Sequence, residues 1–372
     1  MSVESLTLAF DPFERVALGR TGLEVTRLAF GSATIGGLFR DVPEQEAVDT
    51  CIHAARMGIR YFDVAPVYGY GNSERRLGAA LATLPRDGFV VSTKVGRLLV
   101  DRDLPTDGLD VDHQRVDGQD DYFYRGTPRV RPVFDYSRDG VRRSLEASLE
   151  RLGLDRIDIA YIHDPDEHWQ AAIDEAYPAL EDLRAQGVVG AIGVGMNQVA
   201  MLERFAREGD FDVFLVANRY TLLDQEALPG LLPLCLERGI AVALGGVFNS
   251  GVLADPRPGA RFGYLPADPD LLARAQRLRE VCDRHGVPLR AAAVQLSLAH
   301  PAVTALVTGV RTTAQLDEYP ELLRRVIPGQ LWEELIAERL LPDDVPVPAA
   351  VSGPSVAARG ATTPGPVPEE LA

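Results

Sequence analysis

The stretch YFDVAPVYGYGNSE, residues 61–74, combines a strand, a turn and the start of a helix. Its apolar run ends in the carboxylate of Asp63, turns at Pro66 and presents Tyr68 before a helical pattern begins. This arrangement is typical of α/β scaffolds, which carry their working side chains on the loops that follow strands. A phenol has an unperturbed pKa of about 10, so Tyr68 needs a neighbouring charge to exchange protons near neutral pH.

Two other β-rich runs end in side chains that could complete a proton-transfer site. Lys94 ends the run VVSTK, and His163 ends the run IDIAYIH. Lys94 would lower the pKa of Tyr68, and Asp63 would fix and balance the lysine. His163 would hydrogen-bond an oxygen on the reacting carbon. The four groups predict proton transfer at a carbonyl or carbinol, a chemistry that an isomerase or an aldolase could also use.

Short β-rich runs alternate with helical patterns from Arg27 to Arg339, which is the signature of repeated βα units and a parallel sheet. Eight such runs predict one (β/α)8 TIM barrel. A doubly wound sheet is disfavoured because no GxGxxG motif follows the first run. The runs span residues 27–31, 60–64, 89–94, 157–163, 188–194, 212–218, 240–245 and 305–309.

Amphipathic stretches between the runs predict α-helices that cover the barrel. Glycine stands just past several helix ends, where it would adopt the left-handed conformation that stops a helix. The expected helices span residues 43–57, 138–152, 171–185, 199–207 and 271–285, and the glycines are Gly58, Gly153, Gly187, Gly239 and Gly286.

Three segments lie outside this alternation. Residues 15–25 alternate around a glycine-containing turn, which predicts a β-hairpin that could close the floor of the barrel. Residues 96–133 are long, polar and rich in Asp and Arg, so we expect them to hang over the active face and shape a substrate pocket. Residues 342–372 are rich in Pro, Ala, Gly and Val and predict a disordered tail. The barrel domain is therefore expected to span residues 15–341.

The composition limits the classes of partner. A formal net charge of −16 disfavours a nucleic-acid or anionic-membrane partner, because both require clustered Lys and Arg. No segment approaches the roughly 20 apolar residues of a membrane span, and the N-terminus lacks a signal-peptide pattern. Cys51, Cys235 and Cys282 are odd in number and far apart, which indicates buried thiols rather than a disulfide framework. We expect a cytoplasmic protein that acts on a small molecule.

The cluster of His163, Asp164, Asp166 and His168 contains residue types that bind divalent ions. Pro165 and the expected turn would point these side chains in different directions, so no metal site is predicted. Asp164 and Asp166 are expected to cap the following helix or to bind substrate hydroxyl groups. A metal-dependent lyase or isomerase would require this metal site.

Several short motifs are similar to the signatures of one enzyme family. The matching residues are 62–69, 72–74, 77–78, 92–94 and 162–163. On these motifs the chain from residue 15 to residue 339 resembles the aldo-keto reductases. The resemblance implies a barrel that binds a nicotinamide dinucleotide without a Rossmann fold. It also implies that Tyr68 is the general acid or base, that Lys94 and Asp63 tune it, and that His163 orients the substrate oxygen.

Within this family, residues 162–166, 192–198 and 245–253 resemble the branch of aldose 1-dehydrogenases that act on L-fucose and D-threo-aldoses. This resemblance implies oxidation of the anomeric carbon of a cyclic sugar to a lactone, with Tyr68 accepting the hydroxyl proton. Alternatives are an NADPH-dependent reductase of aldehydes or ketones and an enzyme like pyridoxal 4-dehydrogenase, whose sequences are similar. A non-enzymatic alternative is a nucleotide-sensing binding subunit.

The resemblance also assigns cofactor contacts, with several departures from the family pattern. Asn197 follows Gly195-Met196, where many members have Ser-Asn, and could bind the carboxamide. Asn218 stands beside Ala217, which replaces the usual Gln, and Phe248 could supply the stacking surface for the nicotinamide. The remaining contacts are Ser250, Gly251, Leu253, Gly309, Arg311, Gln315 and Glu318.

The choice between NAD and NADP depends on three of these residues. Arg311 could contact a 2′-phosphate, and backbone N–H groups at the start of a helix suit phosphate. The lysine common in strict NADP-binding members is replaced by Gly309, and Glu318 could instead meet the adenine or ribose. We therefore expect NAD, with NADP as the alternative.

Overall fold

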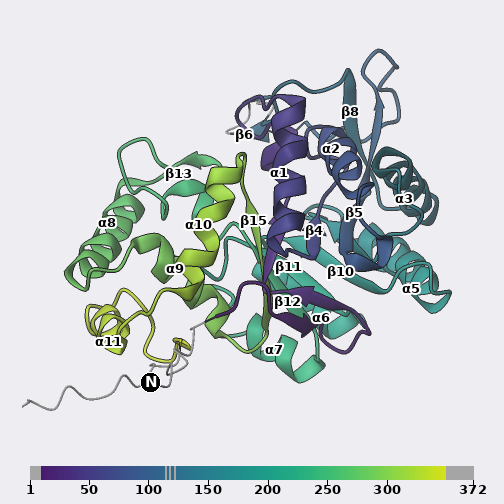
Figure 1. Cartoon of the computed structure of the whole chain (residues 1–372). Helices are drawn as coiled ribbons and strands as arrows, with labels where there is room; N and C mark the ends of the chain where they lie inside the picture. The colour runs from purple at the N-terminus through teal and green to yellow at the C-terminus, as the bar shows by residue number, and fades with distance from the viewer. Residues whose placement is uncertain (1–9, 114, 117–118, 121–122, 349–372) are drawn as a thin grey trace, which may run out of the picture.

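The computed structural model describes residues 10–113, 115–116, 119–120 and 123–348 (Figure 1). Within these residues, eight parallel strands form a closed barrel in which each strand pairs with the next and the last pairs with the first. The predicted barrel is confirmed. Its strands are β3 (Leu28–Gly31), β4 (Tyr61–Asp63), β5 (Val90–Asp101), β9 (Ile159–His163), β10 (Ala191–Met196), β11 (Val213–Ala217), β12 (Ala241–Gly245) and β15 (Val303–Gly309).

Helices surround the barrel, as expected for βα units. The five predicted helices are present, and the five glycines that follow helices have φ between 63° and 113°, in the left-handed region. The covering helices are α1 (Glu44–Met57), α2 (Asn72–Leu81), α3 (Arg138–Leu152), α5 (Tyr177–Ala185), α6 (Val199–Glu208), α7 (Leu231–Arg238), α9 (Leu289–Ala299) and α10 (Thr313–Arg324). Among the described residues, three further helices lie outside this set: the short α4 (Trp169–Ala171), the longer α8 (Pro269–Arg284) and α11 (Gly329–Ala337).

The N-terminal hairpin closes one end of the barrel. Strands β1 (Arg15–Ala17) and β2 (Glu24–Thr26) pair antiparallel, and Leu18 between them is fully buried. Leu18 and Val25 belong to the apolar cluster inside the barrel, together with Tyr61 and Tyr161. Figure 1 shows this purple hairpin at the lower end of the barrel. The prediction that the hairpin closes the floor of the barrel is therefore confirmed. The opposite, upper end of the barrel is not covered by this hairpin.

Two inserted ribbons lie at the opposite end of the barrel (Figure 1). Strand β5 continues beyond the barrel and pairs antiparallel with β8 (Val130–Asp135), so the two ends of the 96–133 segment form a β-ribbon rather than a simple loop. It also holds the short strands β6 (Arg115–Val116) and β7 (Gln119–Asp120). The second ribbon is β13 (Arg261–Phe262) with β14 (Leu265–Pro266). The rings of Phe123 and Tyr264 join the two insertions at a centroid distance of 5.3 Å.

The C-terminal boundary differs from the expected one. Val345 is only 5% exposed and belongs to the main core, and Val347 packs against that core. Packed structure thus extends past residue 341 to residue 348 at least. Residues 349–372, the rest of the expected tail, lie outside the described residues.

In the described ranges, no helix combines the length and the apolar character needed to cross a membrane. Cys51, Cys235 and Cys282 are buried free thiols, as predicted.

Candidate active site

The ends of β4, β5 and β9 bring four predicted side chains together at the upper end of the barrel. Lys94 Nζ donates hydrogen bonds to Asp63 Oδ2 over 2.7 Å and to the Val64 carbonyl over 3.1 Å. The same ammonium lies 4.5 Å from the centre of the Tyr68 ring. The Tyr68 ring meets the His163 ring edge-on, with centroids 5.8 Å apart. Neighbouring parallel strands thus place the four groups as the sequence predicted.

Ser92 holds the second oxygen of the Asp63 carboxylate. Its Oγ donates a 2.6 Å hydrogen bond to Asp63 Oδ1. Ser92 and Lys94 are two residues apart in β5, so their side chains point to the same face of the strand. Both oxygens of the Asp63 carboxylate therefore accept a hydrogen bond, one from Ser92 and one from Lys94, and this fixes the orientation of the carboxylate.

The net shift of the Tyr68 pKa is upward, although Lys94 lies 4.5 Å from the ring centre and was expected to lower it. The pKa of the Tyr68 phenol lies well above its usual value, first because burial disfavours the charged phenolate and then because the Asp63 carboxylate repels it. The Asp63 carboxylate lies 2.7 Å from the Lys94 ammonium, so its negative charge opposes the ammonium at Tyr68. Tyr68 is consequently held as a neutral phenol.

His163 is held neutral and fixed through its backbone. Burial lowers the pKa of its imidazole well below the usual value, and the charges of Arg97 and Lys94 lower it further. Its carbonyl accepts hydrogen bonds of 2.7 Å from Arg97 Nη1 and from the Tyr136 hydroxyl. A neutral imidazole can donate one hydrogen bond to a substrate oxygen without competing for the proton of Tyr68.

A cavity of about 280 Å³ opens onto these groups. Tyr68, Lys94 and His163 form one side of its lining, and the inserted segments add aromatic rings. Beside those three, the lining comprises Leu38, Val67, Arg97, Phe123, Tyr124, Asp164, Asp166, Gly195, Met196, Asn197, Leu215, Ala217, Asn218 and Tyr264. This mixture of aromatic, acidic and amide side chains suits a small polar ligand.

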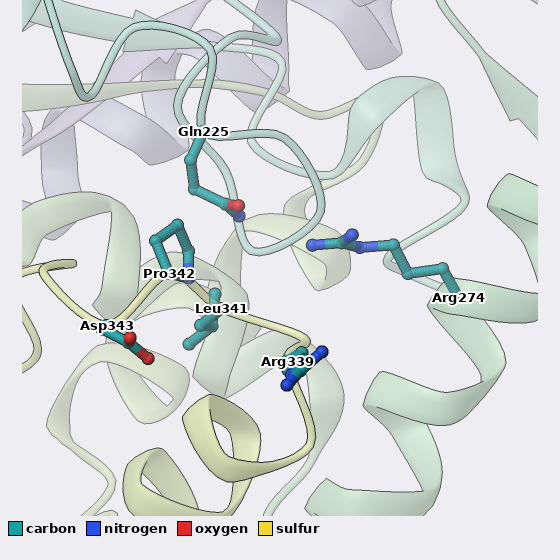
Figure 2. A pocket seen from close by; sticks show the side chains of 6 residues that line it. All are labelled: Gln225, Arg274, Arg339, Leu341, Pro342 and Asp343. Atoms are coloured by element: carbon teal, nitrogen blue, oxygen red, sulfur yellow. The ribbon is translucent and has the colours of Figure 1, made fainter.

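A second hollow, of about 490 Å³, shares no lining residue with this cavity (Figure 2). It is lined by Gln225, Arg274, Arg339, Leu341, Pro342 and Asp343. Arg274 Nη2 donates a 2.8 Å hydrogen bond to the Leu340 carbonyl, which ties α8 to the C-terminal segment. We assign a structural role to this arginine and no chemistry to the hollow.

Among the side chains that line the cavity, sequence reasoning did not single out Arg97, Tyr124 or Tyr264. Lys94 and Arg97 both reach the cavity although side chains of a strand alternate between faces. Gly96, with φ of 103°, interrupts that alternation. A glycine inside a strand pattern is a signal of such a break. The two tyrosines lie on insertions, and no local pattern marks them.

The prediction that Asp164 and Asp166 cap the following helix is not met. The N-cap position of α4 is His168, and it has no side-chain cap. Asp166 Oδ1 accepts a hydrogen bond from Gln198 Nε2. His168 Nε2 lies 2.8 Å from Asp110 Oδ2, away from His163. In the part of the chain that the structure describes, no three His, Cys, Asp or Glu side chains are grouped to hold a metal ion.

Two of the predicted cofactor residues, Asn197 and Asn218, line the cavity. Asn218 Oδ1 is buried and has no hydrogen-bond partner among the described residues. A buried amide oxygen without a partner is costly, so an amide-bearing ligand would satisfy it. This orphaned acceptor fits the carboxamide of a nicotinamide.

The other predicted cofactor residues lie beyond the cavity lining, around η4 (Asn249–Gly251) and the β15–α10 connection. The Phe248 ring packs 6.0 Å from the Tyr319 ring and 5.4 Å from the Arg290 guanidinium, and it is not part of the cavity lining. Leu253 is fully buried in the core. Ser250 Oγ accepts a hydrogen bond from the Tyr264 amide, and Gly251 has φ of 108°.

The residues expected to choose between NAD and NADP are engaged with protein groups. Arg311 Nη2 donates a 2.8 Å hydrogen bond to the Leu38 carbonyl, and the Arg311 amide donates to Gln315 Oε1 over 2.9 Å. Glu318 pairs with Arg290. A Cβ on Gly309 would lie 3.1 Å from Thr34, so this position is crowded.

Comparisons with known proteins agree with this geometry. The sequence model of the aldo/keto reductase family matches residues 27–335. D-threo-aldose 1-dehydrogenase from a Pseudomonas species is 43% identical over 330 residues, which cover 88% of this chain and 98% of that protein. Pyridoxal 4-dehydrogenase from Microbacterium luteolum is 41% identical over 344 residues, with the same coverage of 88% and 98%.

A solved structure has the same fold. The aldo-keto reductase from Bacillus halodurans, in its holo form, superposes with a TM-score of 0.66 at 24% identity. The match covers 91% of this chain and 98% of that one.

Proposed function

Because this chain belongs to the aldo/keto reductase family of NAD(P)-dependent oxidoreductases, we propose that it oxidises an aldose of the L-fucose or D-threo-aldose type at the anomeric carbon to a lactone. The observation that carries the proposal is the convergence of the Tyr68 phenol, the Lys94–Asp63 pair and the His163 imidazole on one cavity. The similarity to D-threo-aldose 1-dehydrogenase supports this class of substrate.

The four side chains divide the work of one proton transfer. Tyr68 would accept the proton of the anomeric hydroxyl, while Lys94 stabilises the phenolate that must form first. Ser92 and Asp63 keep the ammonium in place over the Tyr68 ring. His163, as a neutral imidazole, would hydrogen-bond the reacting oxygen and orient it toward Tyr68. A bound nicotinamide nucleotide would supply the hydride acceptor.

We propose NAD as the preferred cofactor. Asn197 and Asn218 would hold the carboxamide, and residues around η4 and the start of α10 would hold the phosphates and adenosine. Arg311 already donates to the Leu38 carbonyl, which leaves it less free to meet a 2′-phosphate. The buried free thiols support a reducing, cytoplasmic location.

A second candidate is a dehydrogenase of pyridoxal. The 41% identity to pyridoxal 4-dehydrogenase favours it, and so do the rings of Phe123, Tyr124 and Tyr264 in the cavity lining, which could stack on a flat heterocycle. This reaction would use the same four groups.

One assay separates these functions. Nicotinamide absorbance is followed with L-fucose, D-arabinose and pyridoxal, each with NAD and with NADP, for the wild type and for Tyr68→Phe. We expect sugar oxidation with NAD, and a loss of roughly 10²- to 10⁴-fold in kcat for the variant. Turnover of pyridoxal alone would select the second candidate. Cofactor binding without turnover of any alcohol or carbonyl would select a nucleotide-sensing subunit.

A further inference from the structure

Asp164, the residue after β9, has a backbone conformation that points to a specific role. Its φ is 40°, in the left-handed region that non-glycine residues seldom adopt. Two hydrogen bonds hold it there: its amide donates to the Gly195 carbonyl over 3.0 Å, and its carbonyl accepts from the Tyr136 hydroxyl over 3.0 Å. Such conformations persist where the surrounding structure imposes them, often at ligand sites.

The Asp164 carboxylate faces the cavity beside His163. Its Oδ2 lies 3.4 Å from His163 Nε2, and its side chain is 39% exposed, so a ligand can reach it. Within the described part of the chain, neither carboxylate oxygen receives a hydrogen bond from a protein group. An ionised carboxylate has about four acceptor positions, and here they are left for a ligand.

Arg97 is too far from Asp164 to satisfy this carboxylate. Its Nη2 is 4.0 Å from Asp164 Oδ2, whereas its Nε donates to Asp112 over 2.7 Å and its Nη1 donates to the His163 carbonyl. The guanidinium therefore supplies positive charge near Asp164 and leaves its oxygens open. The carboxyl pKa is raised to about 6, chiefly because the surrounding protein keeps bulk water away from the carboxylate inside the cavity, with Arg97 opposing the rise and Asp166 adding to it.

We propose that Asp164 accepts a hydrogen bond from the hydroxyl group on the carbon next to the reacting carbon, and so selects substrates with two adjacent oxygens. This inference rests on the proposed function, in which His163 binds the anomeric oxygen. The 3.4 Å between His163 Nε2 and Asp164 Oδ2 lets the two groups bind neighbouring oxygens of one sugar. A charge-assisted bond of this kind is about twice as strong as a neutral one.

The test compares L-fucose with 2-deoxy-L-fucose, which lacks the neighbouring hydroxyl, for the wild type and for Asp164→Asn. Asparagine has nearly the same shape and tolerates the left-handed conformation, so the fold should be kept. We expect kcat/KM on L-fucose to fall roughly 3- to 10-fold, because the asparagine amide oxygen can still accept the hydrogen bond but lacks the charge that about doubles its strength. On the 2-deoxy sugar it should change little.

The ratio of kcat/KM on L-fucose to kcat/KM on 2-deoxy-L-fucose is measured within one protein preparation. A smaller fraction of active enzyme lowers both values equally and does not change this ratio. Asp174→Asn is the matched control, because it removes an exposed carboxylate that follows β9 but does not line the cavity. An equal loss on both sugars, or no loss on L-fucose, would overturn the role of Asp164 alone. A wild type that oxidises neither sugar would overturn the proposed function and this inference with it.

Discussion

The ammonium of Lys94 lies 2.7 Å from the carboxylate of Asp63, and the two side chains are only 1% and 3% exposed. At this depth each charge is compensated almost entirely by the other, because water cannot reach either. Burial is the main reason that the Tyr68 phenol stays protonated in the protein alone, and the Asp63 carboxylate adds to it by opposing the ammonium. The same pair makes the site sensitive to the loss of one partner.

Replacing only one member of the pair should lower the free energy of unfolding more than replacing both members does. Lys94→Met leaves an uncompensated buried carboxylate, so we expect it to lower the free energy of unfolding by about 3–5 kcal/mol. Adding Asp63→Asn should recover much of that loss. Urea unfolding of the wild type, both single variants and the double variant measures the coupling. Strictly additive effects would show that the pair is not coupled.

Oxidation should depend on pH more steeply than reduction. The pKa of Tyr68 is raised by burial and by Asp63, so near neutral pH only a small fraction is phenolate. Oxidation needs that phenolate as a base, and its fraction grows with pH below the pKa. We expect kcat/KM for oxidation to rise between about pH 7 and 9, while carbonyl reduction, which uses the phenol, stays level. Equal pH profiles in both directions would contradict the assignment, and Tyr68→Phe should abolish the rise.

The floor of the barrel can be weakened without touching the site. Leu18, which lies in the hairpin between β1 and β2, is fully buried in the apolar cluster inside the barrel. Leu18→Ala should lower the free energy of unfolding by about 2–5 kcal/mol and leave kcat unchanged. Leu104→Ala is the control, because Leu104 is 55% exposed and its truncation should change the free energy by less than about 0.5 kcal/mol. A matching loss in both variants would argue against the hairpin's role.

The sequence pattern located helix α3, whose burial varies along the chain, and missed helix α9, whose burial hardly varies. Helix α3 shows one apolar face and a glycine stop, so its bounds were predicted correctly. Helix α9 was missed because nine of its eleven residues are buried, which leaves no polar face to reveal the helical period. The fifth strand was predicted at 188–194 but spans Ala191–Met196, since Val188 is 49% exposed and precedes it.

The site residues that follow from the ends of barrel strands could be predicted from the sequence. The site residues that come from the inserted segments could not. Asp63, Lys94 and His163 meet because parallel strands end at the same edge. Tyr124 lies near Tyr68, with ring centroids 6.3 Å apart, only because the ribbon after β5 folds back over the barrel. Tyr264 reaches the same cavity from another insertion. A local sequence pattern cannot predict that residues from two insertions far apart in the sequence line the same cavity.

The position of the domain boundary can be tested by truncation. Val345 is 5% exposed and packs into the core, so a chain that ends at Leu341 loses this contact and one wall of the hollow in Figure 2. Burial of such a side chain contributes about 1.5–3 kcal/mol, and we expect the free energy of unfolding to fall by that amount. A chain that ends at Pro348 keeps the contact and should unfold like the full-length protein. Val345→Ala in the full chain is the control, because it removes part of the same contact without shortening the chain. If the chains that end at Leu341 and Pro348 unfold at the same urea concentration, the boundary lies at Leu341 after all.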